Sequence, residues 1–534
     1  MSATTNTVCE SACLETGAQV LAVTVKQDYD ESHRQPELPM DIFLGEKPAQ
    51  MGPNHVSGGD SDPDHTSYEG RWIALGVMLA ASFMNLIDVT IVNVALPSLQ
   101  VGLGASDTEI EWVVAAYIMA FSIGLLPFGR LGDMLGRRTM FLAGVSCFTL
   151  ASALCGLAPN IQTLVFSRVF QGLAGAMMMP QTLAIAQTIF PPKERGSAFS
   201  LFGLAAGLAS VSGPLIGGVL IGLDIYGLSW RPIFLVNIPI GIIAIVAGYK
   251  VIPRGLENPS VGIDFIGILL AGLTVLFLIF PLVEGRDFGW PSWLFVMMAT
   301  SVLTGYLFVR WQSYRARLEM PQLMPATVLH NRRFITGALM TTLLFSSVPG
   351  LFMVLAVFLQ VGFGLSPLQS GLTTLPFAVA FLTASLIANR LGSNAPRIRV
   401  VFGSSLMLIG VIVLRYVLAG VGEVVVASHL IVPLALTGLG LGTTIPALFQ
   451  TVLANMEGRD AGSASGSLQA FQQAGAALGV AVMGQIFFSQ LSGQTGGSSH
   501  AAFIEALRTA LLYSMAAFSF VIIGGLRMQI VKHH

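Results

Sequence analysis

Long apolar stretches separated by short polar connections follow one another from residue 71 to the C-terminal region of the chain. Each stretch has about the 20 residues that an α-helix needs to cross the hydrocarbon core of a bilayer. The pattern therefore predicts about fourteen transmembrane helices. We place them at 72–97, 109–129, 139–158, 162–188, 197–222, 232–251, 263–282, 291–310, 334–360, 367–389, 400–419, 428–453, 461–489 and 508–527.

Backbone chemistry and composition both favour an all-α polytopic membrane protein. Unpaired backbone polar groups are too costly in lipid to allow open strands, and the sequence lacks the short alternating segments of a membrane barrel. Hydrophobic residues make up 54% of the chain and charged residues only 10%, whereas soluble domains carry about 25% charged residues. The formal net charge of −1 indicates no nucleic-acid partner.

The basic residues of the connections are divided very unequally between the two sides of the membrane. Cytoplasmic connections carry an excess of Lys and Arg. We therefore expect the alternate connections that are rich in these residues to be cytoplasmic, together with both chain termini. The chain is then a multi-pass protein of the cytoplasmic (inner) membrane. The poor set contains Arg231, Arg286 and Arg508. The rich set contains Arg130, Arg137, Arg138, Lys193, Arg195, Lys250, Arg254, Arg310, Arg315, Arg317, Arg332, Arg333, Arg390, Arg397, Arg399 and Arg459.

Two connections are echoed about 260 residues further along the chain. The connection at 129–138 is echoed at 389–399, and the one at 193–200 is echoed at 458–465. Two echoes at a similar offset predict two related six-helix halves, a common plan of secondary transporters. The predicted divisions are a disordered cytoplasmic tail at 1–70, an N-terminal half at 71–255, an inserted helix pair at 256–320, a C-terminal half at 321–528 and a short cytoplasmic tail at 529–534.

Asp88 and Arg168 are the ionisable residues expected deep inside the predicted helices. At 1.5 Å per residue both lie roughly 10–14 Å below the outer boundary, so they are expected to share a depth. A charge at that depth normally faces a cavity or a partner, and a buried carboxylate can bind and release a proton near neutral pH. We expect Asp88 to carry protons and Arg168 to assist the coupling. The alternatives are a structural carboxylate and a permanent hydrogen-bonding strut.

The short connection at 129–138 is a candidate gating latch. Its glycines permit a tight turn, and Asp133 is expected to accept backbone hydrogen bonds at a helix N-terminus or to pair with an arginine. The alternative is a connection that only signals topology. The loop residues are Gly129, Asp133, Gly136, Arg137 and Arg138.

Small residues in the helix at 197–222 permit the close approach of another helix. Pro214 favours a bend in this helix. A spacing of three or four residues predicts that one helix face is formed by Gly203, Gly207, Ser210, Pro214 and Gly217. We expect a hinge or seal between the two halves, with static packing as the alternative. The candidate residues are Gly207, Gly213, Pro214, Gly217 and Gly218.

Other polar side chains at membrane depth are candidates for lining a substrate cavity, with helix–helix hydrogen bonding as the alternative. We find no nucleophile–base pair and no metal-ligand spacing in a plausible context. We therefore expect neither an enzyme nor a metal site, and no cofactor besides the proton gradient as energy source. The cavity candidates are Asn85, Asn93, Gln171, Gln181, Asn237 and Gln472.

In several motifs that include the candidate residues above, the sequence resembles the major facilitator superfamily, and within it the fourteen-helix drug:proton antiporter family. The resemblance covers nearly everything from Arg71 to Met528 and implies the major facilitator fold, two six-helix halves plus two inserted helices. The second-half loop departs from it, because Ser393 stands where the first half has Asp133. The motifs that carry the resemblance are LIDVTIVNVALP at 86–97, GRLGDMLGRR at 129–138, Arg168–Gly172, GPLIGG at 213–218, SWRPIFLVNIPIG at 229–241 and EGRDFGW at 284–290.

The resemblance implies a function as well as a fold. It implies a proton-coupled antiporter of the multidrug efflux type that exports small amphipathic or cationic compounds. Asp88 would be its coupling carboxylate and Arg168 the supporting basic residue. The alternatives are a narrow-substrate metabolite or siderophore exporter and a non-transporting membrane sensor. The expected partners are a small-molecule substrate, protons and the lipid bilayer. We expect a monomer, with an outer-membrane or periplasmic adaptor as an alternative.

Overall fold

Fourteen helices among the described residues are long and apolar enough to cross a membrane. The computed structural model describes residues 68–254, 262–391, 395–420, 425–453, 461–492 and 500–527, which all belong to one unit, Pro63–His534. The prediction of an all-α fold with about fourteen spans is confirmed. The predicted tails at 1–70, apart from residues 68–70, and at 529–534 lie outside the described residues, as does Ser393.

The first six spans run from the start of α1 to the end of α7. Pro239 has no backbone N–H to continue the helical hydrogen-bond pattern, and the sixth span is divided at Val236. The helices are α1 (Arg71–Leu103), α2 (Asp107–Leu135), α3 (Arg137–Gly156), α4 (Ile161–Ile189), α5 (Pro192–Gly222), α6 (Pro232–Leu235) and α7 (Asn237–Val251), with the short turn η1 (Ile225–Gly227) between α5 and α6.

The last six spans follow a short helix, α10 (Ala326–His330). The span predicted at 334–360 is divided in two before Pro349, which cannot donate a backbone hydrogen bond. The last helix begins at His500, earlier than the predicted 508. The helices are α11 (Arg332–Phe345), α12 (Val348–Val357), the π-helical turn η2 (Phe358–Gly362), α13 (Pro367–Leu391), α14 (Pro396–Ala419), α15 (Ala427–Leu453), α16 (Ala461–Ser492) and α17 (His500–Arg527).

Two helices, α8 (Phe265–Glu284) and α9 (Ser292–Arg317), lie between the two sets of six spans in sequence. They pack against each other, and α8 also contacts α2 and α16. Only 22% of the most apolar stretch of α8 and 17% of that of α9 are buried. The pair therefore lies at the edge of the bundle, with most of its apolar surface available to lipid.

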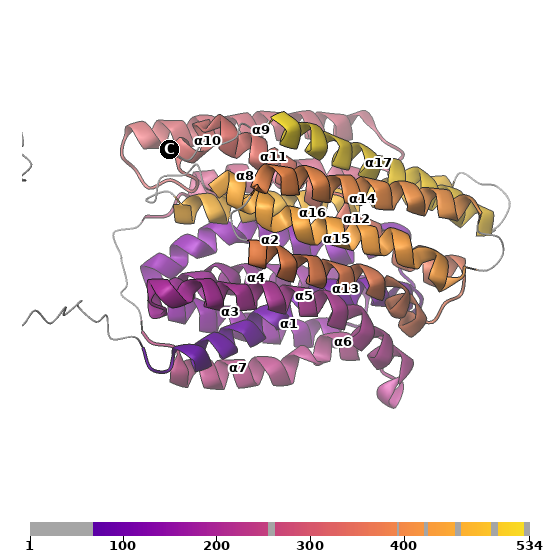
Figure 1. Cartoon of the computed structure of the whole chain (residues 1–534), viewed down its shortest axis with the longest axis horizontal. Coiled ribbons are helices and arrows are strands. Elements are labelled where there is room, and N and C mark those ends of the chain that lie inside the picture. Colours follow the sequence, from indigo (N-terminus) through magenta and orange to yellow (C-terminus); the bar gives the residue numbers. More distant parts are fainter. Residues whose placement is uncertain are drawn as a thin grey trace, which may run out of the picture. The chain divides into compact units, whose positions relative to one another are not determined.

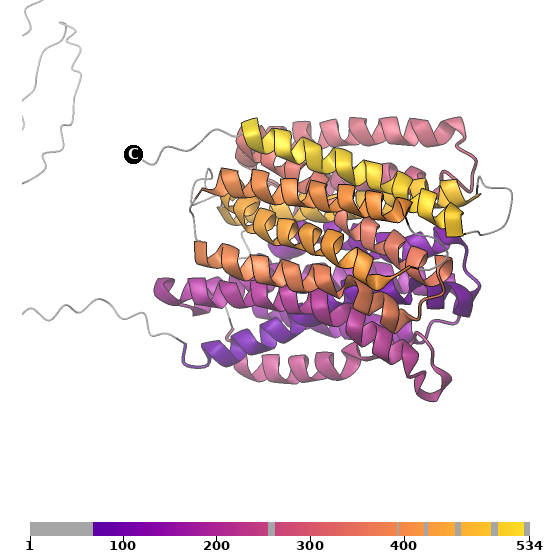
Figure 2. The same cartoon turned by 45° about the vertical axis from the view of Figure 1, so that its right-hand side comes forward.

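The two six-span halves lie side by side (Figures 1 and 2), with indigo to magenta helices α1–α7 on one side and orange to yellow helices α13–α17 on the other. Contacts between the halves are made mainly by α5 with α13 and by α2 with α16. We call the end of the bundle at which α1 begins the proximal end and the opposite end the distal end. The four helices just named therefore form the seam that any relative motion of the halves must change.

Arg71 ties together helix ends at the proximal end. Its Nε lies 2.8 Å from Oε2 of Glu194, which is in the first turn of α5. The hydrogen bond from Arg71 holds the pKa of the Glu194 carboxyl below its ordinary value. The hydroxyl of Tyr68 donates to the carbonyl oxygen of Val251 at 2.8 Å. The proximal ends of α1, α5 and α7 are thus fixed relative to one another.

Candidate functional site

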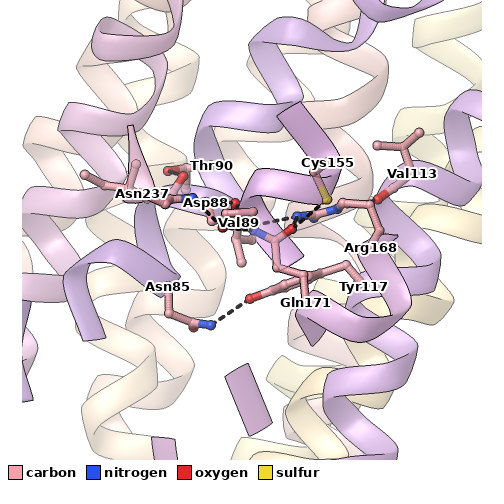
Figure 3. Close-up of polar contacts among 12 residues, drawn as sticks. Asn85, Asp88, Val89, Thr90, Val113, Tyr117, Cys155, Arg168, Gln171 and Asn237 are labelled. Atoms are coloured by element: carbon pink, nitrogen blue, oxygen red, sulfur yellow. Dashed lines mark hydrogen bonds and ion pairs between the residues drawn. The ribbon is translucent and has the colours of Figure 1, made fainter. Parts of the chain in front are cut away.

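Asp88 lies in the middle of α1 and is 0% exposed. Its Oδ2 accepts a hydrogen bond from Nη1 of Arg168 at 2.5 Å. Its Oδ1 accepts from Nε2 of Gln171 at 2.8 Å and from Nδ2 of Asn237 at 3.2 Å (Figure 3). The prediction that Asp88 and Arg168 share a depth is confirmed, and the two side chains form a buried ion pair that joins α1 to α4.

Arg168 is held from several directions and is 1% exposed. Its Nε donates to the carbonyl oxygen of Val113 at 3.0 Å, and its Nη1 also donates to Oε1 of Gln171 at 2.7 Å. The guanidinium carbon lies 4.1 Å from the centroid of the Tyr117 ring, a cation–π contact that is strongest when water is excluded. The charge of Arg168 is therefore shared among a carboxylate, two carbonyl oxygens and an aromatic face.

Gln171 and Asn237 belong to this polar cluster. Their side-chain amides both donate to Oγ of Ser152, at 2.8 Å and 3.3 Å, and the thiol of Cys155 lies 3.5 Å from Oε1 of Gln171 (Figure 3). Neither amide is among the residues that line the central cavity described next. Their prediction as cavity residues is wrong, because each side chain points toward Asp88 and is occupied by hydrogen bonds to it.

A cavity of about 950 Å³ lies at the seam between the two halves. Its walls come from α1, α2, α4 and α5 of the first half and from α11, α12, α13, α15 and α16 of the second. The predicted residues Asn85, Asn93 and Gln472 line it, but Gln181 does not. Instead Gln181 donates to the carbonyl oxygen of Phe128 at 2.8 Å and packs against Gly132, because it lies nearer the proximal end of α4. Its prediction as a cavity residue is also wrong.

Tyr117 stands between this cavity and the buried ion pair. It lines the cavity, and its hydroxyl accepts a hydrogen bond from Nδ2 of Asn85 at 2.7 Å, while its ring covers Arg168. Asp88 and Arg168 do not line the cavity. Sequence reasoning missed Tyr117, although a tyrosine in an otherwise apolar helix is a recognisable signal, because its polar end needs a partner.

The loop after α2 is bound to neighbouring helices of the first half. Arg137 lies 3.2 Å from Oδ1 of Asp133 and donates to the carbonyl oxygen of Ala184 at 3.1 Å. The pairing of Asp133 with an arginine is therefore confirmed. Gly136 has φ of 91°, a conformation that favours glycine. Gly129 approaches Pro180, since a methyl group there would lie 3.8 Å from its Cβ.

Arg138 and Arg130 extend the contacts of this loop. Arg138 donates to the carbonyl oxygen of Tyr249 in α7, and its guanidinium lies 5.0 Å from the Tyr249 ring. Arg130 donates to the carbonyl oxygen of Gln322 at 3.0 Å, which lies between α9 and α10. The contacts of Asp133, Arg137 and Arg138 thus join helices of one half, and a gating function for the loop stays a prediction.

The small residues of α5 face two different helices. Methyl groups at Gly213 and Gly217 would collide with α1, whereas methyl groups at Gly207 and Gly218 would collide with α13. A methyl group at Gly371, also in α13, would collide with the carbonyl oxygen of Pro214. The predicted face of small residues therefore meets two helices, with Gly207 against α13 and Gly217 against α1, because α5 is wedged between two close neighbours. Its function as a hinge or seal stays a prediction. Its predicted position between the halves is confirmed by the α13 contacts.

A second ion pair, in which the carboxylate is buried and the arginine is partly exposed, lies at the distal end. Glu111 is 0% exposed, and its Oε1 is 3.4 Å from Nη1 of Arg286 in the loop between α8 and α9. Its other oxygen, Oε2, has no hydrogen-bond partner among the described residues and packs against Gly484 of α16. Arg286 also lies 5.1 Å from the ring of Phe488. The inserted pair thus contacts both halves through one arginine.

Replacing Arg286 with Met is expected to destabilise the protein by about 3–5 kcal/mol, because it leaves the Glu111 carboxylate buried without its partner. The measurement is thermal unfolding of the purified protein in detergent. The control is Arg508→Met, since Arg508 pairs with Glu505 at 2.8 Å where both are partly exposed and such pairs contribute about 0–1 kcal/mol. Equal shifts in Tm for the two variants would contradict the expectation.

The fourteen spans of the described residues, the cavity at the seam between the halves and the buried ion pair beside it are the features of a multi-pass membrane transporter. Residues 78–480 match the Major Facilitator Superfamily. The chain belongs to this superfamily. The resemblance found in the sequence is confirmed, and the relatives are antibiotic and multidrug resistance transporters of the drug-efflux type.

Two relatives and one solved structure illustrate the similarity. The chain is 38% identical to the "Probable actinorhodin transporter" of Streptomyces coelicolor, covering 82% of this chain and 76% of the relative. It is 35% identical to the "Puromycin resistance protein pur8" of Streptomyces alboniger, covering 78% and 82%. An auto-inhibited peptide transporter of the POT family shares the fold, with a TM-score of 0.60 at 17% identity over 86% of this chain and 98% of that chain.

Proposed function

We propose that the protein is a proton-coupled antiporter that exports small amphipathic compounds across the cytoplasmic membrane. The observation that carries the proposal is the pairing of Asp88 with Arg168 in a cluster beside the cavity, where both are at most 1% exposed. Intramembrane charges are costly to bury and usually mark a substrate or proton pathway. Asp88 is the group that would carry the proton.

Protonation of Asp88 would change which helices are held together. The neutral carboxyl no longer balances the charge of Arg168, so the contact between α1 and α4 weakens. The guanidinium then depends on Tyr117 and on carbonyl oxygens for its stabilisation. Because Tyr117 also lines the cavity, its movement would connect the protonation state of Asp88 to the shape of the substrate site. Such a local change in charge can bias a two-state bundle.

The direction of transport rests on topology and on the relatives. The excess of basic residues in alternate connections favours cytoplasmic termini, and we propose that the proximal end faces the cytoplasm. The relatives named above are described as a transporter and a resistance protein, which supports export. Each name also contains a single compound, which favours a narrow-substrate exporter as the second candidate. We propose that the transporter works as a monomer, without a cofactor, on the proton gradient alone.

Transport in everted vesicles tests the proposal. Vesicles from cells that express the protein carry a pH-sensitive dye, and a panel of aromatic and aliphatic drugs is added after the gradient is established. Proton-coupled export predicts that some members of the panel collapse part of the gradient. Vesicles with the Asp88→Asn variant are the control. If the dye responds equally in both vesicle preparations to every compound, proton coupling through Asp88 is excluded.

Tyr117→Ala is expected to uncouple proton movement from transport. Removing the ring takes away the barrier between the cavity and Arg168, so protons should leak in the absence of substrate. Tyr117→Phe keeps the ring over Arg168 and loses only the hydrogen bond from Asn85, so it should leak little. Proton entry into proteoliposomes, measured with an internal pH dye and without substrate, distinguishes the variants. Equal leak rates for the two variants would contradict the proposal that the Tyr117 ring forms the barrier.

A further inference from the structure

The central cavity carries no charged side chain among the described residues that line it. The carboxylate of Asp88, whose chain neighbour Val89 lines the cavity, already has three hydrogen-bond donors, one of them the Arg168 guanidinium. Tyr117 and Asn85 form the cavity wall in front of this pair. A cation in the cavity would therefore meet ring faces and amide oxygens but no available carboxylate. Each cation–π contact stabilises a cation by less than the cost of burying a charge that has no counter-charge.

Aromatic rings form walls on two sides of the cavity. Tyr117 and Phe121 of α2 lie with their ring centroids 6.2 Å apart and an interplanar angle of 29°. On the second half, the rings of Phe377 and Phe381 in α13 are 6.4 Å apart and nearly parallel, at 5°, and Phe352 of α12 meets Phe377 edge-on at 4.6 Å. All five line the cavity. Rings offered by both halves favour a flat aromatic ligand that can stack on them.

Amide side chains supply the polar part of the lining. Gln469, Gln472 and Gln473 of α16 have the spacing of one helix face and all line the cavity. Asn85 and Asn93 of α1 line it as well. An amide both donates and accepts hydrogen bonds and carries no net charge. These groups match carbonyl and hydroxyl substituents on the edge of a ring system better than they match an ionic group.

We propose that the substrate is an uncharged, largely planar aromatic compound whose rim carries carbonyl and hydroxyl groups. This inference rests on the proposed export function and narrows its substrate class, since it sets aside the cationic compounds that the sequence analysis had included. The cavity volume of about 950 Å³ is at the upper end of ligand pockets, which measure about 300–1,000 Å³. Several fused rings therefore fit within it.

A matched pair of probes tests the substrate class. Both are hydroxyanthraquinones with the same short side chain, which ends in a hydroxyl group in one probe and in a trimethylammonium group in the other. Binding to the purified full-length protein in nanodiscs is followed by the fluorescence of the quinone. We expect the neutral probe to bind at least about tenfold more tightly, which corresponds to 1.4 kcal/mol. Equal binding, or tighter binding of the cation, would overturn the substrate class.

A charge placed in the cavity provides the second measurement. Gln472→Glu keeps the size of the side chain and adds a carboxylate to the lining, so it should strengthen binding of the trimethylammonium probe and weaken that of the neutral probe. The control is Gln369→Glu, because Gln369 is exposed, does not line the cavity and caps the start of α13, a role that glutamate also fills. If Gln472→Glu leaves the probe preference unchanged, these compounds do not bind in this cavity.

The outcomes separate the substrate class from the proposed function. If neither probe binds while other compounds still collapse the proton gradient in vesicles, the substrate class is wrong and the antiporter stands. If the neutral probe binds but no compound moves protons, the substrate class is supported and the proposed proton antiport is rejected. If neither probe binds and no compound moves protons, both the substrate class and the proposed antiport are rejected.

Discussion

Asp88→Asn is expected to reduce proton-coupled efflux to the level of membranes that lack the protein. Asparagine keeps the shape of the side chain but cannot bind and release a proton, so the step that consumes the gradient is lost. The same change leaves Arg168 buried without a counter-charge, which is expected to destabilise the protein by about 3–5 kcal/mol. Substrate uptake into everted vesicles and thermal unfolding in detergent measure the two effects separately.

A double variant separates the proton role of Asp88 from a structural role. Asp88→Asn combined with Arg168→Gln removes both buried charges, so the thermal stability should recover most of what the single change loses. Efflux should stay absent, because no proton carrier is restored. If efflux recovers together with stability, Asp88 is a structural carboxylate and does not carry protons. Asp88→Glu, which retains a titratable group, should keep measurable coupling.

Gly218→Ala is expected to disturb the equilibrium between the open and closed states of the distal end. The added methyl group would lie 2.6 Å from Cα and 2.9 Å from the backbone N of Leu368 in α13, and these backbone atoms cannot rotate away. Overpacking of this kind costs about 1–3 kcal/mol, which changes a conformational equilibrium by about 5- to 150-fold. The distal ends of α5 and α13 should separate, and efflux should fall.

Gly222→Ala is the matched control for this change. Gly222 also lies in α5, but a methyl group there would meet nothing within 4 Å. Distances between spin labels at the distal ends of α5 and α13 report the separation directly, and efflux is measured on the same variants. If Gly218→Ala gives the same label distances as Gly222→Ala, the seam at Leu368 tolerates the extra volume and does not control closure.

The spans and the depth of the central charges could be predicted from the sequence because both depend on distance along single helices. Each span is apolar over its own length, and 1.5 Å per residue places Asp88 and Arg168 at one level. The direction in which a side chain points around the helix axis could not be predicted in this way. Gln171 and Gln181 were both assigned to the cavity, yet one faces Asp88 and the other faces Gly132. Packing against neighbouring helices fixes the rotation of each helix about its axis, and the sequence of a single helix does not show it.

Charges near helix ends were harder to interpret from the sequence. Glu111 lies in the second turn of α2, where a carboxylate would ordinarily reach water. It is buried because the loop containing Arg286 and the α16 residue Gly484 cover it. Asp264 at the start of α8 is buried in the same way and accepts hydrogen bonds from Trp311 and Gln312. Contacts between distant segments produce these sites, and hydropathy along one segment carries no signal of them.

The contact of Arg286 with both halves affects which state the transporter occupies at rest. Arg286 holds Glu111 of α2 and lies over Phe488 of α16, so separation of these two helices at the distal end must break at least one of its contacts. The free energy of that contact then adds to the cost of opening toward the distal side. Each 1.4 kcal/mol lowers the resting population open on that side about tenfold. If the protein alternates between two open states as proposed, the inserted helix pair is expected to bias an idle transporter toward loading from the proximal side.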